Sequence, residues 1–204
     1  MTAPAPRPSR SAHRERVTKE TSVSLGLDLD GPNGEVRVST GLPFFDHMLD
    51  QIGRHAGFDL VIEATGDLHV DGHHTVEDVG ITFGEVFALA LGDKTGIRRF
   101  ASGLYPLDEA LVEVALDLSG RPFVAYDVPF GEVLPLGDPP FNPEMAGHFW
   151  HSFAVSAGIT LHVTRRAGTN THHLIEATFK GVSRALRDAV RVEGAGVPST
   201  KGSL

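Results

Sequence analysis

The hydrophobic positions of this chain change period along the sequence, from alternation to helical spacing and back. Near the start, mostly apolar side chains occupy every second position, which is typical of a half-buried strand. Further on, apolar residues recur three and four positions apart, which predicts amphipathic helices. The pattern gives strands over 16–28, 35–39 and 58–63, and helices over 44–56 and 74–91. A turn at 30–34 joins the first two strands, so we expect them to form a hairpin.

The same order of elements recurs in the second part of the chain. Strands are predicted over 111–118, 122–128 and 159–164, helices over 148–157 and 172–190, and a Pro- and Gly-rich loop over 130–143. The repeat holds at single residues, since His47 precedes Gly57 by ten positions and His148 precedes Gly158 by ten. We therefore predict an α+β fold of two pseudo-symmetric strand-strand-helix-strand-helix halves from internal duplication, with sheets backed by helices.

The predicted organisation is one compact catalytic unit with a tail at each end. Residues 1–14 are expected to be a disordered tail, 15–95 the first half, 96–193 the second half, and 194–204 a flexible C-terminal tail that binds phosphate. The first residues are rich in Pro, Ala, Ser and Arg and lack an apolar run, so they resemble neither a secretory signal nor an anchor. No window approaches the ~18 apolar residues of a spanning helix.

The charge and composition of the chain argue against two classes of binding partner. The net charge is -8, with no basic face of the kind that binds duplex nucleic acid, so neither nucleic acid nor membrane is expected as a partner. Any anionic substrate must be met by local cations. The chain has 0 Cys, which removes thiolate ligands and disulfides and fits a cytoplasmic location.

The sequence His-His-x-x-Glu occurs twice, at 73–77 and 172–176, and each copy follows another histidine at a similar distance. Imidazole with carboxylate suits Mn, Fe or Zn better than Ca or Mg. Residues four apart on a helix share a face while adjacent ones point about 100° apart, so the two histidines of a pair should serve different ions. We predict one metal held by His73, Glu77, His148 and His173, and another held by His172, Glu176, His47 and His74.

Three nitrogens and one oxygen in each predicted set favour manganese. An octahedral Mn²⁺ would keep two positions for substrate or water, whereas Zn²⁺ more often closes four ligands tetrahedrally. A lone His-His pair is more often a surface dipeptide, and Asp71 and Asp78 could form simple ion pairs with His73 and His74. The repetition with matched spacing favours metal binding over that interpretation.

Four stretches carry a resemblance to the imidazoleglycerol-phosphate dehydratases of histidine biosynthesis. They are residues 44–49, 71–78, 172–180 and 198–202, and the likeness runs from about Arg14 to Leu204. The resemblance implies a hydro-lyase that converts imidazole glycerol phosphate to imidazole acetol phosphate. It also implies two Mn²⁺ ions per active site and a homo-oligomer of 24 subunits. A route through an imidazolate and a diazafulvene-like intermediate is our hypothesis for the chemistry.

The resemblance also assigns residues to the substrate. Glu20 matches the family's candidate acid/base, and a carboxylate beside apolar strand neighbours fits a proton shuttle in contact with substrate. Phosphate binding falls by resemblance on Arg99, Arg121, Ser199 and Lys201. Arginine can hold phosphate with two hydrogen bonds and lysine as a point charge, although each cation alone is more often simply solvated.

Two other functions stay open from the residues alone. A two-metal phosphoesterase also uses histidine and carboxylate ligands, although it usually has more bridging carboxylates. A non-catalytic metal-binding assembly protein would use the histidines to join subunits and would not need Arg99, Arg121 and Lys201.

Overall fold

The computed structural model describes residues 9–131, 133–200 and 202, and it divides into two similar halves. The first half contains β1 (Ser11–Val17), β2 (Thr21–Asp28), β3 (Val36–Ser39), α1 (Pro43–Ala56), β4 (Asp59–Gly66) and α2 (His73–Leu91). The second contains β5 (Phe100–Leu107), β6 (Ala110–Asp117), β7 (Phe123–Asp127), α3 (Glu144–Ala157), β8 (Thr160–Ala167) and α4 (Thr171–Ala189). The predicted α+β class with duplicated halves is confirmed, and each half has one more strand than predicted.

The additional strand of each half lies at a sheet edge. β1 begins at Ser11 and pairs with β2 in antiparallel register. Residues 11–14, which were predicted to belong to a disordered tail over 1–14, are therefore part of a strand. Most side chains of β1 are exposed, and an edge strand of this kind is held by backbone hydrogen bonds without an apolar alternation. The predicted strand over 16–28 is broken by a turn before Thr21, and β5 was not predicted.

The two sheets have matching topologies, with strand orders β1-β2-β4-β3 and β5-β6-β8-β7. The predicted hairpin of residues 16–28 and 35–39 is wrong, because β3 pairs in parallel with β4 and β2 lies between β1 and β4. A central position gives β2 a neighbour on each side. Its inward residues Val23, Leu25 and Leu27 are buried as a result.

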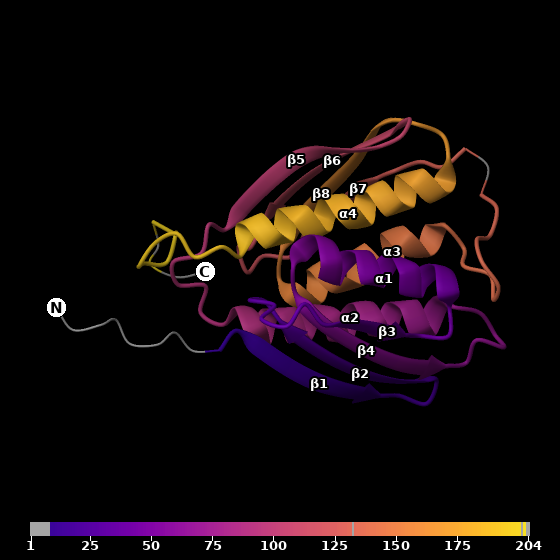
Figure 1. Ribbon diagram of the computed structural model, residues 1–204, viewed down its shortest axis with the longest axis horizontal. Helices are drawn as coiled ribbons and strands as arrows, with labels where there is room; N and C mark the ends of the chain where they lie inside the picture. Colours follow the sequence, from indigo (N-terminus) through magenta and orange to yellow (C-terminus); the bar gives the residue numbers. More distant parts are fainter. Residues whose placement is uncertain (1–8, 132, 201, 203–204) are drawn as a thin grey trace.

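The four helices lie between the two sheets, as Figure 1 shows. α2 packs on α3 and α1 packs on α4, so each contact joins the first helix of one half to the second helix of the other. Aromatic side chains fill the space between these helices, including Phe83, Phe149 and Phe153. No helix in the described ranges is long and apolar enough to cross a membrane. The fold thus places the starts of helices from both halves close together.

Candidate active site

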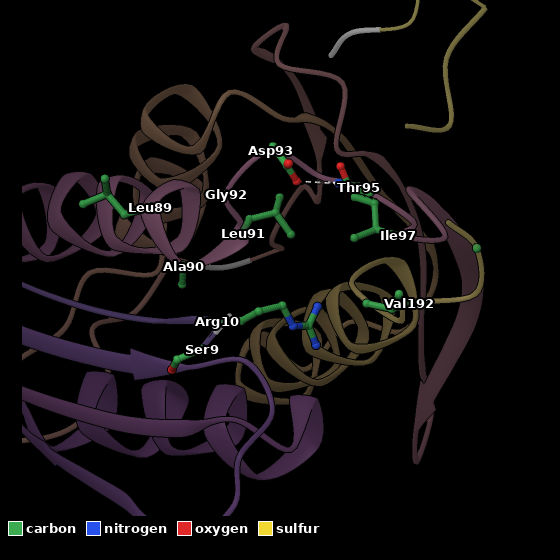
Figure 2. A pocket seen from close by; sticks show the side chains of 11 residues that line it. Ser9, Arg10, Leu89, Ala90, Leu91, Gly92, Asp93, Thr95, Ile97 and Val192 are labelled. Atoms are coloured by element: carbon green, nitrogen blue, oxygen red, sulfur yellow. Dashed lines mark hydrogen bonds between the residues drawn. The ribbon is translucent and has the colours of Figure 1, made fainter. Parts of the chain in front are cut away.

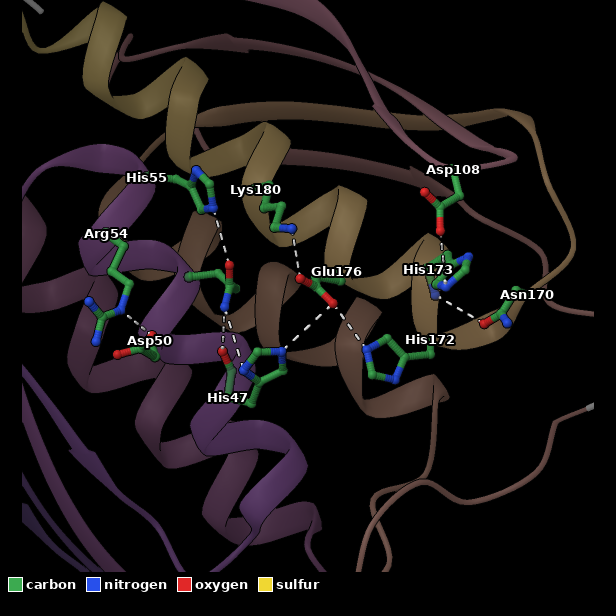
Figure 3. Close-up of polar contacts among 11 residues, drawn as sticks. His47, Asp50, Arg54, His55, Asp108, Asn170, His172, His173, Glu176 and Lys180 are labelled. Atoms are coloured by element: carbon green, nitrogen blue, oxygen red, sulfur yellow. Dashed lines mark hydrogen bonds and ion pairs between the residues drawn. The ribbon is translucent and has the colours of Figure 1, made fainter.

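One cluster of potential ligands joins α1 to α4. His47, His172 and Glu176 offer ligand atoms that all lie within 4.8 Å of one another. The carboxylate Oε2 of Glu176 is 3.0 Å from His172 Nε2 and 3.7 Å from His47 Nε2 (Figure 3). His172 and Glu176 meet because they are four residues apart on one helix face. We call this set cluster I.

A second cluster joins α2 to α3 and repeats the first. His73, Glu77 and His148 offer ligand atoms within the same 4.8 Å, and the rings of His73 and His148 have centroids 4.4 Å apart. His148 Nε2 is 3.5 Å from Glu77 Oε1, yet among the described residues it is buried without a hydrogen-bond partner. A buried nitrogen of this kind costs free energy unless it gains a partner, and a metal ion would provide one. We call this set cluster II.

One group in each cluster has a pKa shift that suits a cation, Glu176 in cluster I and His148 in cluster II. Burial would raise the pKa of Glu176, but hydrogen bonds from Lys180 and His172 outweigh it and hold that pKa below its usual value. Lys180 Nζ lies 2.7 Å from Glu176 Oε1. Burial, and then the charge of His73, lower the pKa of His148. Both shifts favour the ligating form of the group, an ionised carboxylate and a neutral imidazole.

The fourth ligand predicted for each set is not brought to its cluster within one chain. His74 Nδ1 lies 3.0 Å from Asp67 Oδ2, and His173 Nδ1 donates to Glu109 Oε2 at 2.7 Å. Figure 3 shows His173 turned toward the β5–β6 turn, away from His47. The hydrogen bond from His173 lowers the pKa of Glu109 to about 2, and the same bond raises the pKa of His173.

These carboxylate partners were missed by sequence reasoning. Histidines that bind metals usually donate their second ring N–H to a carboxylate, which fixes the tautomer and leaves the other nitrogen for the ion. Asp67 precedes α2 closely, whereas Glu109 is 64 residues from His173, so no local spacing could have found it. Both histidines therefore have the partner expected of a ligand.

Glu20 lies in the turn between β1 and β2 and not on a strand as predicted. Its side chain is exposed. The pKa of His74 is raised by the hydrogen bond to Asp67, and the charge of Glu20 adds to that effect. The predicted acid/base is thus near the start of α2, where His73, His74 and Glu77 are located.

The predicted phosphate residues gather around a different cavity. Arg99, Arg121, Ser199 and their neighbours Pro198 and Thr200 line an open cavity of about 590 Å³. Arg99 binds Asp117 through Nε at 2.7 Å and donates to the carbonyl of Pro198, while Arg121 is mostly exposed. Lys201 is outside the described residues.

Lys94 is a further cation near this cavity that the sequence analysis did not select. Burial lowers its pKa, the charge of Asp117 opposes that change, and the charges of Arg99 and Arg121 lower it further. Its backbone has a left-handed φ of 62°, which a lysine rarely adopts. No sequence pattern selects Lys94, because its position near the cavity depends on this backbone conformation in a short loop.

The cavity at Arg99 and Arg121 and cluster I lie at opposite ends of α4. Cluster I uses residues at the start of this helix, whereas the backbone of Arg99 donates to the carbonyl of Ala189 at its end. At 1.5 Å per residue, the helix places Ala189 roughly 20 Å from Glu176.

Another cavity opens at the end of α2, as Figure 2 shows. It has a volume of about 550 Å³ and is lined by Ser9 and Arg10, by the last residues of α2 and those that follow it, and by Val192 and Gly194. Arg10 Nη1 already donates to the carbonyl of Val190 at 2.6 Å. The cavity contains none of the residues predicted to bind metal or substrate.

The fold and site together define a duplicated α+β protein with two crossed histidine–carboxylate clusters and a separate cationic cavity. The family model described as imidazoleglycerol-phosphate dehydratase matches residues 40–186. The chain therefore belongs to the imidazoleglycerol-phosphate dehydratase family. This membership makes it an enzyme, a hydro-lyase of histidine biosynthesis.

Relatives and solved structures agree with this membership. The imidazoleglycerol-phosphate dehydratase of Acidothermus cellulolyticus is 55% identical over 201 residues, covering 98% of this chain and 96% of that protein. The one of Methanopyrus kandleri is 52% identical, with 96% of each covered. The Staphylococcus aureus enzyme structure matches with a TM-score of 0.79 at 32% identity, covering 89% of this chain and 99% of the other. A Pyrococcus furiosus structure in complex with (S)-C348 matches with 0.77 at 35% identity, covering 94% and 100%.

Proposed function

We propose that this chain dehydrates imidazole glycerol phosphate to imidazole acetol phosphate, with two Mn²⁺ ions in each active site. The observation that carries the proposal is the pair of crossed clusters, each with two histidines and one carboxylate within 4.8 Å. An imidazole substrate has two ring nitrogens and can span two such ions. As a member of a biosynthetic family, the enzyme is proposed to act in the cytoplasm.

The missing fourth ligands are proposed to come from a neighbouring subunit. His74 is adjacent to His73 of cluster II, and His173 is adjacent to His172 of cluster I. If His74 of one chain enters cluster I of another, it brings its own cluster II beside that cluster. His173 of the second chain then reaches that cluster II in return. One interface would therefore complete both four-ligand sets and create a dinuclear centre.

The donor chemistry supports manganese as the metal. Three imidazoles and one carboxylate leave two positions of an octahedral ion for substrate or water. The lowered pKa of Glu176 and of His148 keeps these ligands available at neutral pH. The carboxylate partners of His74 and His173 would hold the ligating nitrogens in one tautomer.

The separation along α4 supports an oligomer on independent grounds. One chain cannot place a phosphate in its own cavity at Arg99 and Arg121 and the imidazole of the same molecule in its cluster I, roughly 20 Å away. The phosphate site is therefore proposed to come from another subunit. Lys201 of that subunit would add a further cation, and the resemblance to the family suggests 24 subunits.

The proposed reaction removes the hydroxyl group next to the ring and a proton from the following carbon. Bound metal ions would lower the pKa of the ring N–H and so favour its loss. Electron density from the ring then expels the hydroxyl, which leaves as water with the proton lost from the ring nitrogen, giving a diazafulvene-like intermediate. Glu20 takes the carbon-bound proton, and the resulting enol becomes the ketone. The charge of Glu20 contributes to the raised pKa of His74, which supports a role for this carboxylate beside α2.

A direct assay tests the proposal. Purified protein is incubated with imidazole glycerol phosphate and Mn²⁺, with a parallel sample in EDTA, and the ketone product is measured. We expect product only when metal is present. Release of inorganic phosphate would instead indicate a phosphoesterase, and bound metal without turnover would indicate an assembly protein.

A further inference from the structure

The turn that carries Glu20 is stabilised by hydrogen bonds to the side chain of Thr18, within the same turn. Thr18 Oγ1 accepts hydrogen bonds from the backbone N–H of Glu20 at 3.2 Å and of Thr21 at 3.0 Å. The backbone N–H of Thr18 donates to the carbonyl of Thr21 at 2.9 Å. These bonds fix the backbone of Glu20 relative to Thr18. The position of the Glu20 carboxylate therefore depends on what holds Thr18 and Thr21.

A single buried carboxylate on α2 holds this turn. Asp78 Oδ2 accepts hydrogen bonds from the hydroxyls of Thr21 and Thr18, and Asp78 Oδ1 accepts one from Arg16 Nε at 2.7 Å. The three donors come from β1, the turn and β2. Asp78 is 7% exposed, and hydrogen bonds to a buried carboxylate are strong and directional. Asp78 of α2 therefore holds the turn and both flanking strands by hydrogen bonds to a single side chain.

Asp78 lies among the proposed metal ligands. Asp78 directly follows Glu77 of cluster II and lies one helical turn after His74. Within the described part of the chain, the Glu20 carboxylate itself has no hydrogen bond or ion pair in the structure. Its distance from the ligands is therefore set through the backbone of the turn and through Asp78.

The second half of the chain lacks this anchor. The counterpart of Asp78 in the second His-His-x-x-Glu motif is Ala177, which is buried. The β5–β6 turn, which corresponds to the turn of Glu20, uses its glutamate, Glu109, to hold His173. The duplicated fold therefore closes this turn without a buried carboxylate. Among the described residues, the buried-carboxylate anchor belongs to the half whose turn glutamate makes no hydrogen bond with its side chain.

We propose that Asp78 is a positioning residue for catalysis, which holds the Glu20 carboxylate against the metal-binding end of α2. This inference rests on the proposed function, in which Glu20 is the proton shuttle. Asp78 does not contact substrate in this role. It keeps the proton acceptor within reach of the reacting carbon.

The test replaces Asp78 by asparagine and follows kcat, KM and metal content. Asp78→Asn keeps the shape but loses the charge that binds Arg16, Thr18 and Thr21. We expect kcat to fall about 10- to 100-fold, as for a small misplacement of a reacting group. KM and the amount of bound Mn²⁺ should stay near the wild-type values.

A double variant separates positioning from a general loss of structure. Asp78→Asn added to Glu20→Gln should reduce kcat no further, because the group that it positions is already disabled. If the two effects multiply instead, Asp78 acts independently of Glu20 and the inference is overturned. Thr21→Val removes one donor of the anchor and tests the same point should Asp78→Asn fold poorly.

Glu85→Gln is the matched control. Glu85 lies on the same helix and pairs with Arg14 of β1 at 2.9 Å, so it joins the same two elements without touching the turn. Its kcat should stay unchanged, and an equal loss would overturn the inference. If Glu20→Gln itself retains kcat, both the proton shuttle and its anchor are wrong. If Glu20→Gln is inactive while Asp78→Asn and Thr21→Val are active, only the anchor is wrong.

Discussion

At the scale of single residues, the two histidines of each adjacent pair differ in their partners. His172 contacts Glu176 within its own cluster, whereas His173 donates to Glu109 in the β5–β6 turn. His73 and His74 differ in the same way, with Asp67 as the partner of His74. One histidine of each pair therefore contacts its own cluster, and the other is held by a carboxylate, as its proposed ligand role in another chain requires.

Replacing Glu109 tests this orienting role. Glu109→Gln cannot accept the charge-assisted hydrogen bond from His173 as strongly, so we expect Mn²⁺ affinity to fall about 10- to 100-fold. Metal bound per chain is measured by equilibrium dialysis at several Mn²⁺ concentrations. Glu113→Gln is the control, because Glu113 lies on β6 nearby but pairs with Arg166. Equal affinities for the wild type and Glu109→Gln would contradict the prediction.

Asp59 gives the fold a pH dependence that is separate from the metal ligands. Burial would raise its pKa, but hydrogen bonds from the backbone of Glu35 and Asn33 and from the Asn33 side chain lower it overall. A lowered folded-state pKa stabilises the protein above the unfolded-state pKa, and this contribution is lost as pH falls through the folded-state value.

We therefore expect Asp59→Asn to lower Tm by a few degrees near neutral pH. The difference from the wild type should shrink in acid, as the pH falls below the ordinary Asp pKa and through the lowered pKa of Asp59, because the wild-type carboxylate then becomes protonated. Thermal unfolding at a series of pH values measures it. Asp50→Asn should change Tm little, since its ion pair with Arg54 is at the surface. A Tm difference that is constant with pH would argue against the carboxylate charge as the cause.

What could be predicted at the residue scale follows local geometry. The pairing of His73 with Glu77 and of His172 with Glu176 needs only helical spacing, and the matched histidines upstream follow from the repeat. Asp67, Glu109 and Lys94 were missed because their contacts depend on how distant segments pack or on a strained loop backbone. Spacing along the sequence does not encode such contacts.

At the scale of elements, helices were easier to predict than strand pairing. The ends of α2 and α4 agree with their hydrophobic periodicity to within one residue. Strand partners were harder, because alternation shows which face is buried but not which neighbour is hydrogen-bonded. The parallel pairing of β3 with β4 and the polar edge strand β1 therefore escaped prediction. The confirmed α+β class relied on the repeat and not on the pairing.

Close packing of α2 on α3 holds cluster II together. Gly84 of α2 lies against the backbone of α3, and a Cβ there would be 2.4 Å from the carbonyl oxygen of Phe153. Gly84→Ala must push the helices apart, so we expect a loss of about 1–3 kcal/mol in unfolding free energy. Since His148 and Glu77 face each other across these helices, Mn²⁺ affinity should fall as well.

Chemical unfolding and metal titration measure both effects of Gly84→Ala. Gly131→Ala is the control, because a Cβ at Gly131 meets nothing within 4 Å. Unchanged stability and metal affinity in Gly84→Ala would show that the helices can separate without cost to the site.

At the scale of the whole molecule, one chain holds the two regions proposed to bind the substrate too far apart for both to contact the same molecule. Cluster I lies at the start of α4, and the cavity at Arg121 lies near its end, roughly 20 Å away by helix length. This separation depends on the length of α4 in the folded chain. The sequence motifs could not predict it, because they do not show where Arg99 and Arg121 lie relative to the clusters. Because of this separation, mixed oligomers of two inactive variants can test whether a site is shared between chains.

Two inactive variants should restore activity together if sites are shared between chains. His172→Ala disables cluster I, and Arg121→Ala disables the phosphate cavity. When both are co-expressed with different tags and purified as mixed oligomers, random assembly gives about one site in four with both regions intact. We expect a comparable fraction of wild-type kcat. Mixing His172→Ala with His47→Ala is the control and should restore nothing, because both changes damage the same cluster of one chain. If the mixture of His172→Ala with Arg121→Ala is no more active than the control mixture, each chain binds substrate by itself, and the argument from the length of α4 is wrong.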